Sequence, residues 1–417
     1  MELKRVVVTG MGALTPVGNT VEEYWNGLIN GVSGAVPVTL FDAAKFKTRF
    51  ACEVKDFDPT RYLDKKDSRK IDRFAQFALV VSDEAMADAG LNADNINPDR
   101  VGVVWGSGIG GLITFQNEVM EFAKGDGTPR FSPFFIPKMI LDIAAGHISM
   151  RHNLRGPNFA VVSACASSTN AIIEAANLIK LGKADIIVSG GSEAVISEAG
   201  LGGFNAMKAM SERNDDPATA SRPYDKDRDG FVMGEAGGAL ILESLDHALA
   251  RGARIICEIA GGGATADAHH ITAPHPEGLG ARNVMLAALE DAGMQPSDID
   301  YINTHGTSTP LGDVAEVKAI LDVFGEHAYN LNISATKSMT GHCLGAAGVI
   351  EAIASIKAVV EDMVPPTINH FTDDPELDPR LNFTFNKAQQ RTVRAALSNT
   401  FGFGGHNACV IVKKFQG

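Results

Sequence analysis

The sequence has 417 residues, of which 45% are hydrophobic and 21% charged, a composition typical of a globular protein with one large or two medium domains. Its formal net charge of −13 argues against nucleic acid or an anionic membrane as the general partner, although it leaves room for a local basic patch. No apolar stretch approaches the roughly 20 residues that a membrane-spanning helix requires.

The cysteines indicate a reducing compartment. They are odd in number, widely spaced and free of CxxC pairs: Cys52, Cys165, Cys257, Cys343 and Cys409. This pattern favours free thiols over a disulfide or zinc framework. The first strand-like run begins at Arg5, and no secretory signal is recognised before it. We therefore expect a soluble, cytoplasmic protein.

Strand-like and helical runs alternate along the chain. Short apolar runs predict strands at Arg5–Thr9, Val101–Trp105, Phe159–Ser163, Asp185–Ser189, Ala239–Glu243, Asp300–Thr304 and Cys409–Val412. Apolar residues at helical spacing predict helices over Phe74–Ala89 and Gly280–Ala292, and a helix that begins at about Asn170. The alternation indicates an α/β architecture.

An internal repeat sharpens this prediction. Ile173-Glu174-Ala175 recurs as Ile350-Glu351-Ala352, 177 residues later, and Asp88-Ala89-Gly90-Leu91 recurs as Asp291-Ala292-Gly293-Met294, 203 residues later. Chance is the alternative for matches this short. If the repeat is real, two similar halves pack against each other, and the drop in offset places extra residues in the first half, for which Thr114–Ile143 is the candidate.

One stretch has the pattern of a catalytic elbow. The apolar run that starts at Asn158 predicts a buried strand, which turns sharply into a helix at Cys165. At a helix N-terminus the unpaired N–H groups and the dipole favour a thiolate, and the small neighbouring residues leave room for a substrate. The alternative is a buried structural cysteine. The 177-residue offset maps Cys165 onto His342, so we expect both side chains to face one cleft.

Three further loops carry candidate functional groups. His305 ends a predicted strand before a loop rich in Gly and Thr, where its ring can meet a substrate. Lys337 and His342 lie in a loop whose glycines open a helix, as in an anion-binding site. The glycines of Gly402–Asn407 let backbone N–H groups approach a ligand closely, as an oxyanion hole requires. The plain alternatives are a histidine bonded to backbone, a solvated lysine and a glycine turn.

The chain resembles the β-ketoacyl-acyl-carrier-protein synthases of the thiolase superfamily. The resemblance is carried by Cys165, by His305 in HGTSTPLGD, by Lys337 and His342 in KSMTGHCLGAAG, and by the motif GFGG. The resemblance covers essentially the whole chain and is closest to the elongating type II synthases, through SGIGG, SRPYD and RDGF. His406 departs from the Thr of many bacterial relatives. The resemblance implies an α/β, thiolase-like duplicated fold with αβαβα layers, divided into halves 1–254 and 255–417.

The family implies a decarboxylative condensation that lengthens an acyl chain by two carbons. Cys165 would hold the acyl chain, while His305 and His342 bond the malonyl thioester oxygen. Lys337 would give electrostatic support, with Glu351 as a partner on the next helix. The N–H groups of Cys165 and Phe401 would form the oxyanion hole. No metal or redox cofactor is implied, and we expect none at the His269, His270 and His275 cluster.

The family also implies substrate and partner contacts. Thr307, Thr309 and, more weakly, Thr272 would line the route of the pantetheine arm, and Ile109 and Phe401 match acyl-pocket and gating positions. Phe134 in the insertion would help to wall the pocket, across the interface of a homodimer. The partner would be an acidic acyl carrier protein, for which the basic island comprises Lys65, Lys66, Arg69, Lys70 and Arg73, with Lys208 and Arg130 as additions. A solvated helix face is the alternative.

Several rival functions stay open. A degradative thiolase needs a second cysteine in a C-terminal CxG loop, where this chain has Gly404-Gly405-His406. An initiating synthase carries asparagine in place of His342, and a chain-length-factor subunit lacks the nucleophile. A hydrolase built from Cys165, His305 and Asp313 leaves Lys337 unused. A polyketide-type ketosynthase would have nearly the same motifs, but the absence of flanking acyltransferase or carrier segments favours a stand-alone fatty-acid enzyme.

Overall fold

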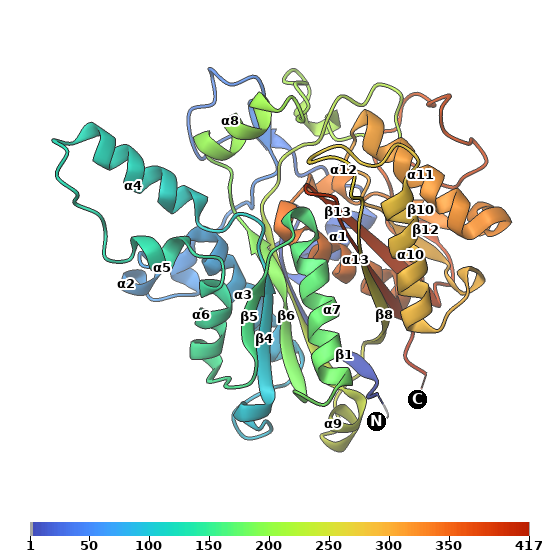
Figure 1. The fold of residues 1–417 in the computed structure, drawn as a ribbon, viewed down its shortest axis with the longest axis horizontal. Helices are drawn as coiled ribbons and strands as arrows, with labels where there is room; N and C mark the ends of the chain where they lie inside the picture. The colour runs from blue at the N-terminus through green and yellow to red at the C-terminus, as the bar shows by residue number, and fades with distance from the viewer. Residues whose placement is uncertain (1–2, 417) are drawn as a thin grey trace.

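The computed structural model describes residues 3–416, and its main feature is one mixed sheet in the order β10-β9-β13-β14-β8-β1-β7-β6-β4-β5 (Figure 1). The runs predicted as strands all fall in it, and most of their side chains are buried. The ten strands are β1 (Val6–Leu14), β4 (Val101–Gly106), β5 (Asn158–Val161), β6 (Ile186–Glu193), β7 (Ala236–Ser244), β8 (Cys257–Ala266), β9 (Tyr301–Asn303), β10 (Asn332–Ser334), β13 (Ala395–Gly402) and β14 (His406–Lys413).

The sheet consists of two halves with the same topology, β1-β7-β6-β4-β5 and β8-β14-β13-β9-β10. In each half, the first two neighbouring pairs are antiparallel and the last two are parallel. The halves join where Val6–Val8 of β1 pairs with Cys257–Ile259 of β8. The prediction of a duplicated α/β fold is therefore confirmed.

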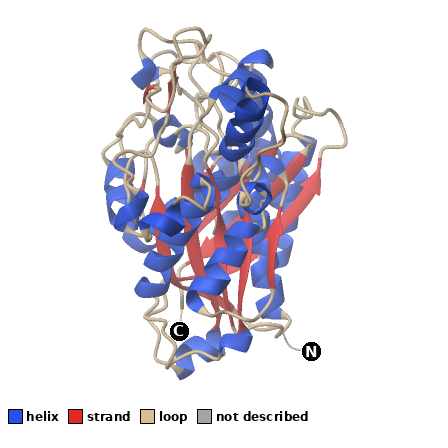
Figure 2. Cartoon of the chain, turned by 90° about the vertical axis from the view of Figure 1, so that its left-hand side faces the viewer, coloured by secondary structure: helices blue, strands red, loops and turns tan. Residues whose placement is uncertain are grey.

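Helices form three layers around the two half-sheets (Figure 2). In the middle layer, α7 (Ser167–Lys180) packs on β6 and β4, and α13 (Ala347–Glu361) packs on both β13 and β7. The outer faces are covered by α3 (Arg73–Asp88) and α6 (Ile143–His152) in the first half, and by α10 (Leu279–Ala292) and α11 (Pro310–Phe324) in the second. The expected αβαβα layering follows.

The remaining helices and the two small strand pairs surround this core. They are the helices α1 (Val21–Ile29), α2 (Lys65–Ser68), α4 (Leu112–Lys124), α5 (Phe135–Met139), α8 (Glu198–Ala206), α9 (Leu245–Ala250) and α12 (Lys337–Thr340), and the strand pairs β2 (Val36–Pro37) with β3 (Phe50–Ala51) and β11 (Met363–Val364) with β12 (Gln389–Gln390). Across residues 3–416, no helix combines the length and the apolar character needed to cross a bilayer.

The two sequence repeats correspond to structure in different ways. Helices α3 and α10 both end at a glycine with positive φ, Gly90 at 64° and Gly293 at 62°, so the second repeat marks equivalent positions. The first repeat is displaced by three residues, because α7 begins at Ser167 and α13 begins at Ala347, a separation of 180 residues. The structural counterpart of Cys165 is therefore Gly345, and not His342 as the 177-residue offset predicted.

The extra residues of the first half project from the body as α4 and α5, which stand apart in Figure 1. Their apolar side chains include the exposed Phe115, Phe122 and Ile136. The neighbouring β5 was expected to be buried, but it is the edge of the sheet, and Phe159 and Val162 are 38% and 58% exposed. The expectation was wrong because an apolar sequence does not reveal whether a strand has a neighbour on both sides.

Candidate active site

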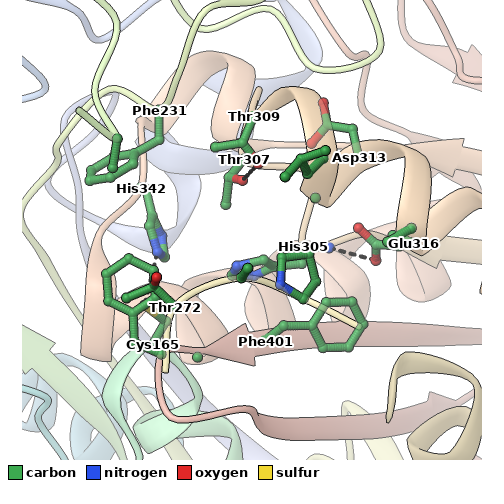
Figure 3. A pocket seen from close by; sticks show the side chains of 18 of the residues that line it. Cys165, Phe231, Thr272, His305, Thr307, Thr309, Asp313, Glu316, His342 and Phe401 are labelled. Carbon is green, nitrogen blue, oxygen red and sulfur yellow. Dashed lines mark hydrogen bonds between the residues drawn. The ribbon is translucent and has the colours of Figure 1, made fainter. Parts of the chain in front are cut away.

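A pocket of about 420 Å³ reaches from the surface down to Cys165. Figure 2 shows that many long loops gather at the end of the molecule opposite the two termini, and the pocket is formed by such loops. Figure 3 shows His342 and His305 beside Cys165, with Thr307 and Thr309 across the opening. The cleft expected to hold Cys165, His305 and His342 is therefore present.

Cys165 lies at a tight elbow between β5 and α7. Ala164 has a φ of 52°, which a residue with a Cβ rarely adopts, and a single 3₁₀ turn (Ala164–Ala166) then leads into α7. Ser167 braces this turn, because its Oγ accepts from Ser163 N at 2.9 Å and donates to Ala164 O at 2.6 Å. The elbow aims Cys165 into the pocket from a helix N-terminus.

The two histidines come from the other half of the fold. His342 precedes the second elbow, and its Nε2 lies 3.1 Å from Cys165 Sγ. His305 follows β9, and its ring centre lies 5.2 Å from that of His342 at an interplanar angle of 90°. The Nδ1 atoms of both rings are buried without a hydrogen-bond partner among the described residues. His342 therefore presents Nε2 to the sulfur, and both rings line the same pocket.

Burial sets the protonation of this site. It lowers the pKa of His305 and of His342 well below the ordinary value, and the Lys337 ammonium lowers both further. Burial also raises the pKa of the Cys165 thiol to about 12, and the opposing effects of Lys337 and backbone N–H groups do not offset it. The expected thiolate is therefore wrong for the resting site, which holds a neutral thiol beside neutral imidazoles.

Two buried carboxylates bond to the backbone of His305 and to Lys337. Glu316 on α11 accepts from the backbone N–H groups of His305 and Gly306, both at 2.9 Å. Glu351 on α13 forms the expected ion pair with Lys337, with both side chains buried. Burial raises the pKa of each carboxyl to about 7. Sequence reasoning missed Glu316, although an acid three residues after Asp313 in a strand-end histidine motif was a usable signal.

The oxyanion-hole role of the Phe401 backbone stays a prediction. Phe401 lies within β13 and is paired with Asn407 of β14, and its ring lines the pocket 5.4 Å from the ring centre of His305. A second backbone N–H, that of Phe403 in the turn after β13, acts on the Cys165 sulfur and lowers its pKa.

The predicted substrate contacts fall into two groups. Thr272, Thr307 and Thr309 line the pocket, and the hydroxyls of Thr307 and Thr309 are 3.0 Å apart. Ile109 does not line it, but packs in the apolar cluster that contains Cys165. Phe134 is 42% exposed on the insertion and does not reach the pocket of its own chain, so its role across a dimer interface stays a prediction.

The predicted carrier-binding residues also lie in two separate places, at the pocket and around α2. Lys208 is exposed at the pocket and follows α8. Lys65 and Arg69 are exposed at α2, next to the insertion, where Lys138 Nζ donates to Arg69 O at 3.4 Å. Lys70 is engaged by Asp67 at 2.8 Å. Figure 1 shows α2 beside α5, so one chain does not bring all of these residues to the pocket.

A nucleophilic cysteine and two imidazoles at the elbow of a duplicated α/β fold define a thiolase-like condensing enzyme. The sequence matches the models "Beta-ketoacyl synthase, N-terminal domain" over residues 3–248 and "Beta-ketoacyl synthase, C-terminal domain" over residues 256–371. The chain belongs to the β-ketoacyl synthase family, as its motifs predicted.

Similar proteins agree with this assignment. The chain is 50% identical over 416 residues to a 3-oxoacyl-[acyl-carrier-protein] synthase 2 of Synechocystis sp., and the match covers 100% of this chain and 99% of that protein. Among solved structures, the ishigamide ketosynthase/chain length factor superposes with a TM-score of 0.92 at 35% identity, covering 99% of this chain and 100% of that one. A ketosynthase in complex with its type II polyketide acyl-carrier protein gives a TM-score of 0.89 at 32% identity, with the same coverage.

Proposed function

We propose that this protein is an elongating 3-oxoacyl-[acyl-carrier-protein] synthase, which joins an acyl group on Cys165 to malonyl-carrier protein with loss of carbon dioxide. The 3.1 Å contact between Cys165 Sγ and His342 Nε2 carries the proposal, because it sets a base against the nucleophile at the end of a substrate-sized pocket. The full-length 50% identity to a synthase 2 supports the fatty-acid substrate class.

In the first half-reaction, the Cys165 sulfur attacks the acyl thioester and its proton passes to His342 Nε2. The raised thiol pKa makes this transfer concerted with attack, because the free thiolate is scarce at neutral pH. The oxyanion accepts from the backbone N–H groups of Cys165 and Phe401. His342 then returns the proton to the carrier thiolate, which leaves as a thiol, and a new thioester remains on Cys165.

In the second half-reaction, His305 donates from Nε2 to the malonyl thioester oxygen. His342 does the same once Cys165 is acylated and no longer offers a proton to its Nε2, because the proton of the neutral ring can then shift from Nδ1 to Nε2. This stabilises the enolate that forms when the C–C bond to the carboxylate breaks and carbon dioxide leaves. The enolate carbon attacks the acyl carbonyl on Cys165, and the sulfur leaves as a thiolate that takes up a proton from solvent. The product is a 3-oxoacyl-carrier protein two carbons longer. Burial, reinforced by the Lys337 charge, lowers the pKa of both imidazoles and so favours their neutral form in this step.

The carrier arm and the partner surfaces complete the proposal. Thr272, Thr307 and Thr309 line the pocket and would bond the pantetheine amides, while Lys208 and the α2 residues would contact the acidic carrier. The similar ketosynthase that was solved in complex with its acyl-carrier protein supports a carrier partner. A homodimer is supported by the open edge of β5 and by the exposed apolar residues of the insertion. Five unpaired cysteines favour the cytoplasm.

The test separates the two half-reactions. Purified protein is incubated with acyl-carrier protein alone, and the Cys165 peptide is weighed; malonyl-carrier protein is then added and the product is weighed. His342→Ala should slow both steps and His305→Ala mainly the second, each by about 10²–10⁴. Release of free fatty acid without a longer product would instead indicate a hydrolase.

A polyketide-type ketosynthase is the second candidate, since one of the solved structures named above is a ketosynthase with a type II polyketide acyl-carrier protein. Its identity of 32% is well below the 50% found for the synthase 2 relative. The same assay decides between them. One extension of a saturated chain is expected here, whereas repeated extension without intervening reduction would indicate a polyketide enzyme.

A further inference from the structure

Glu193, at the end of β6, is a fully buried carboxylate that the mechanism above does not use. It lies where three segments meet: the loop that carries Ile109, the first elbow and the second elbow. Burial raises the pKa of this carboxyl, while its hydrogen bonds act in the opposite direction. A charge in such a place requires compensation by donors.

Five donors surround the two oxygens. Oε1 accepts from Ser107 Oγ at 3.0 Å, Ile109 N at 3.1 Å and Gly110 N at 3.0 Å. Oε2 accepts from Gly108 N at 2.8 Å and Gly345 N at 3.0 Å. No Lys, Arg or His within residues 3–416 forms an ion pair with it. Because every partner is a donor, the group acts as an ionised acceptor.

The backbone segments around this carboxylate are closely packed. A Cβ at Gly345 would lie 2.3 Å from Gly108 N and 2.6 Å from Glu193 Oε2, and a Cβ at Gly108 would lie 2.9 Å from the same oxygen. The latter Cβ would also lie 3.1 Å from Ala164 O in the first elbow. The loop of residues 107–110 is thus held at once against Glu193 and both elbows.

Ile109 is the side chain that this loop presents to the site. It is half-buried and packs against the apolar cluster of Cys165, Phe231 and Leu344, three residues that line the open pocket, although Ile109 itself does not line it. An acyl chain on Cys165 must displace apolar side chains of this cluster to be buried. Three consecutive N–H groups bond to Glu193, so the backbone of the loop resists displacement. Ile109 can therefore move only by a change of its side-chain rotamer.

We propose that Glu193 is a positioning residue that holds Ile109 against Cys165 and thereby limits the length of acyl chain accepted. The inference rests on the proposed acyl transfer to Cys165. Glu193 acts through backbone hydrogen bonds and not through contact with the substrate. Loosening the loop should favour long chains over short ones, because a long chain needs the larger displacement of Ile109.

The test uses Glu193→Gln, which replaces one oxygen by an amide that must face at least two N–H donors. The rate of acyl-enzyme formation is measured with hexanoyl- and tetradecanoyl-carrier proteins. We expect the tetradecanoyl-to-hexanoyl ratio of kcat/KM to rise about tenfold, on the scale of selectivity in apolar pockets. Glu243→Gln, a buried glutamate on β7 that contacts Thr9, His247 and Arg251, is the matched control and should leave the ratio unchanged.

A second readout distinguishes positioning from a general loss of structure. In the background of Ile109→Ala, Glu193→Gln should no longer shift the chain-length ratio, because the two residues act through one loop.

If Glu193→Gln fails to fold, Ser107→Ala provides the test, because it removes only one hydrogen bond to Glu193 Oε1. This variant should shift the chain-length ratio in the same direction by about threefold. If Glu193→Gln folds and its tetradecanoyl-to-hexanoyl ratio is unchanged, the inference is overturned. If Glu193→Gln does not fold, an unchanged ratio in Ser107→Ala overturns it. Absence of any acyl-enzyme in the unaltered protein would instead reject the proposed function itself.

Discussion

The first elbow, which begins at Ala164, and the second, which begins at Leu344, share a backbone. Their first residues have φ values of 52° and 49°, and a 3₁₀ turn and a long helix follow in both. The first elbow places Cys165 in the pocket. In the second, Gly345 takes the equivalent position, and its N–H is bonded to Glu193.

The difference shows how a duplicated fold produces a single reactive centre. Each elbow offers the N-terminus of a helix, which favours an anion. At the second elbow, an internal carboxylate fills that position permanently. At the first, backbone N–H groups act on the Cys165 sulfur instead, at the place where an oxyanion would form during the reaction. The histidines then come from residues outside the repeat: His342 lies in the longer segment that separates β10 from the second elbow.

Removing the sulfur of the first elbow should give the largest effect. Cys165→Ala is expected to lower condensation by at least about 10⁴, because no acyl-enzyme can form. The matched control is Cys343→Ala, which removes a buried thiol immediately before the second elbow and should change the rate by less than about threefold. The assay is product mass after incubation with acyl- and malonyl-carrier proteins. Equal losses in both variants would mean that the two elbows do not differ in function.

The pH dependence of Cys165 reactivity tests whether burial outweighs the helix N-terminus. With a thiol pKa of about 12, the thiolate fraction rises with pH throughout the measurable range. Alkylation by iodoacetamide should therefore accelerate about tenfold per pH unit from pH 7 to 10. The lowered pKa of His342 keeps the ring neutral, so no acid step is expected near pH 6.5. A plateau below pH 9 would show that the elbow stabilises the thiolate after all.

Sequence patterns predicted the features that depend on local chemistry. Period and composition placed β1, α3 and α10, and the Cys-His-His motifs placed Cys165 and His342 at one site. The pattern of β8 was not recognised, since three consecutive glycines interrupt its apolar run. The displaced repeat also had a local cause, because matching letters in α7 and α13 do not lie at matching helical positions.

What the sequence could not predict depends on three-dimensional burial. The thiol pKa was misjudged because the helix N-terminus is visible in the sequence while the degree of desolvation is not. Glu193 and Glu316 escaped notice because the donors that surround each of them come from other segments.

The Lys337–Glu351 pair tests how far the second half serves only as support. Lys337→Met leaves Glu351 buried and unpaired, so the free energy of unfolding should fall by about 3–5 kcal/mol. Adding Glu351→Leu should restore most of that stability. Condensation should remain lower by about 10² in both variants, because the charge that adds to burial in lowering the pKa of His305 and His342 is lost. Recovery of activity with stability would make the pair purely structural.

The smallest effect is expected at the pocket mouth, where charge acts on encounter and not on the reacting atoms. Lys208→Glu should raise KM for acyl-carrier protein about three- to tenfold with kcat nearly unchanged, and should weaken the dependence of KM on salt. Lys183→Glu, at an exposed position before β6, is the control of equal charge change. If both variants raise KM equally, the effect reflects net charge. A rise confined to Lys208→Glu would instead mean that the carrier approaches the open elbow through a local basic contact, on a protein whose overall charge repels it.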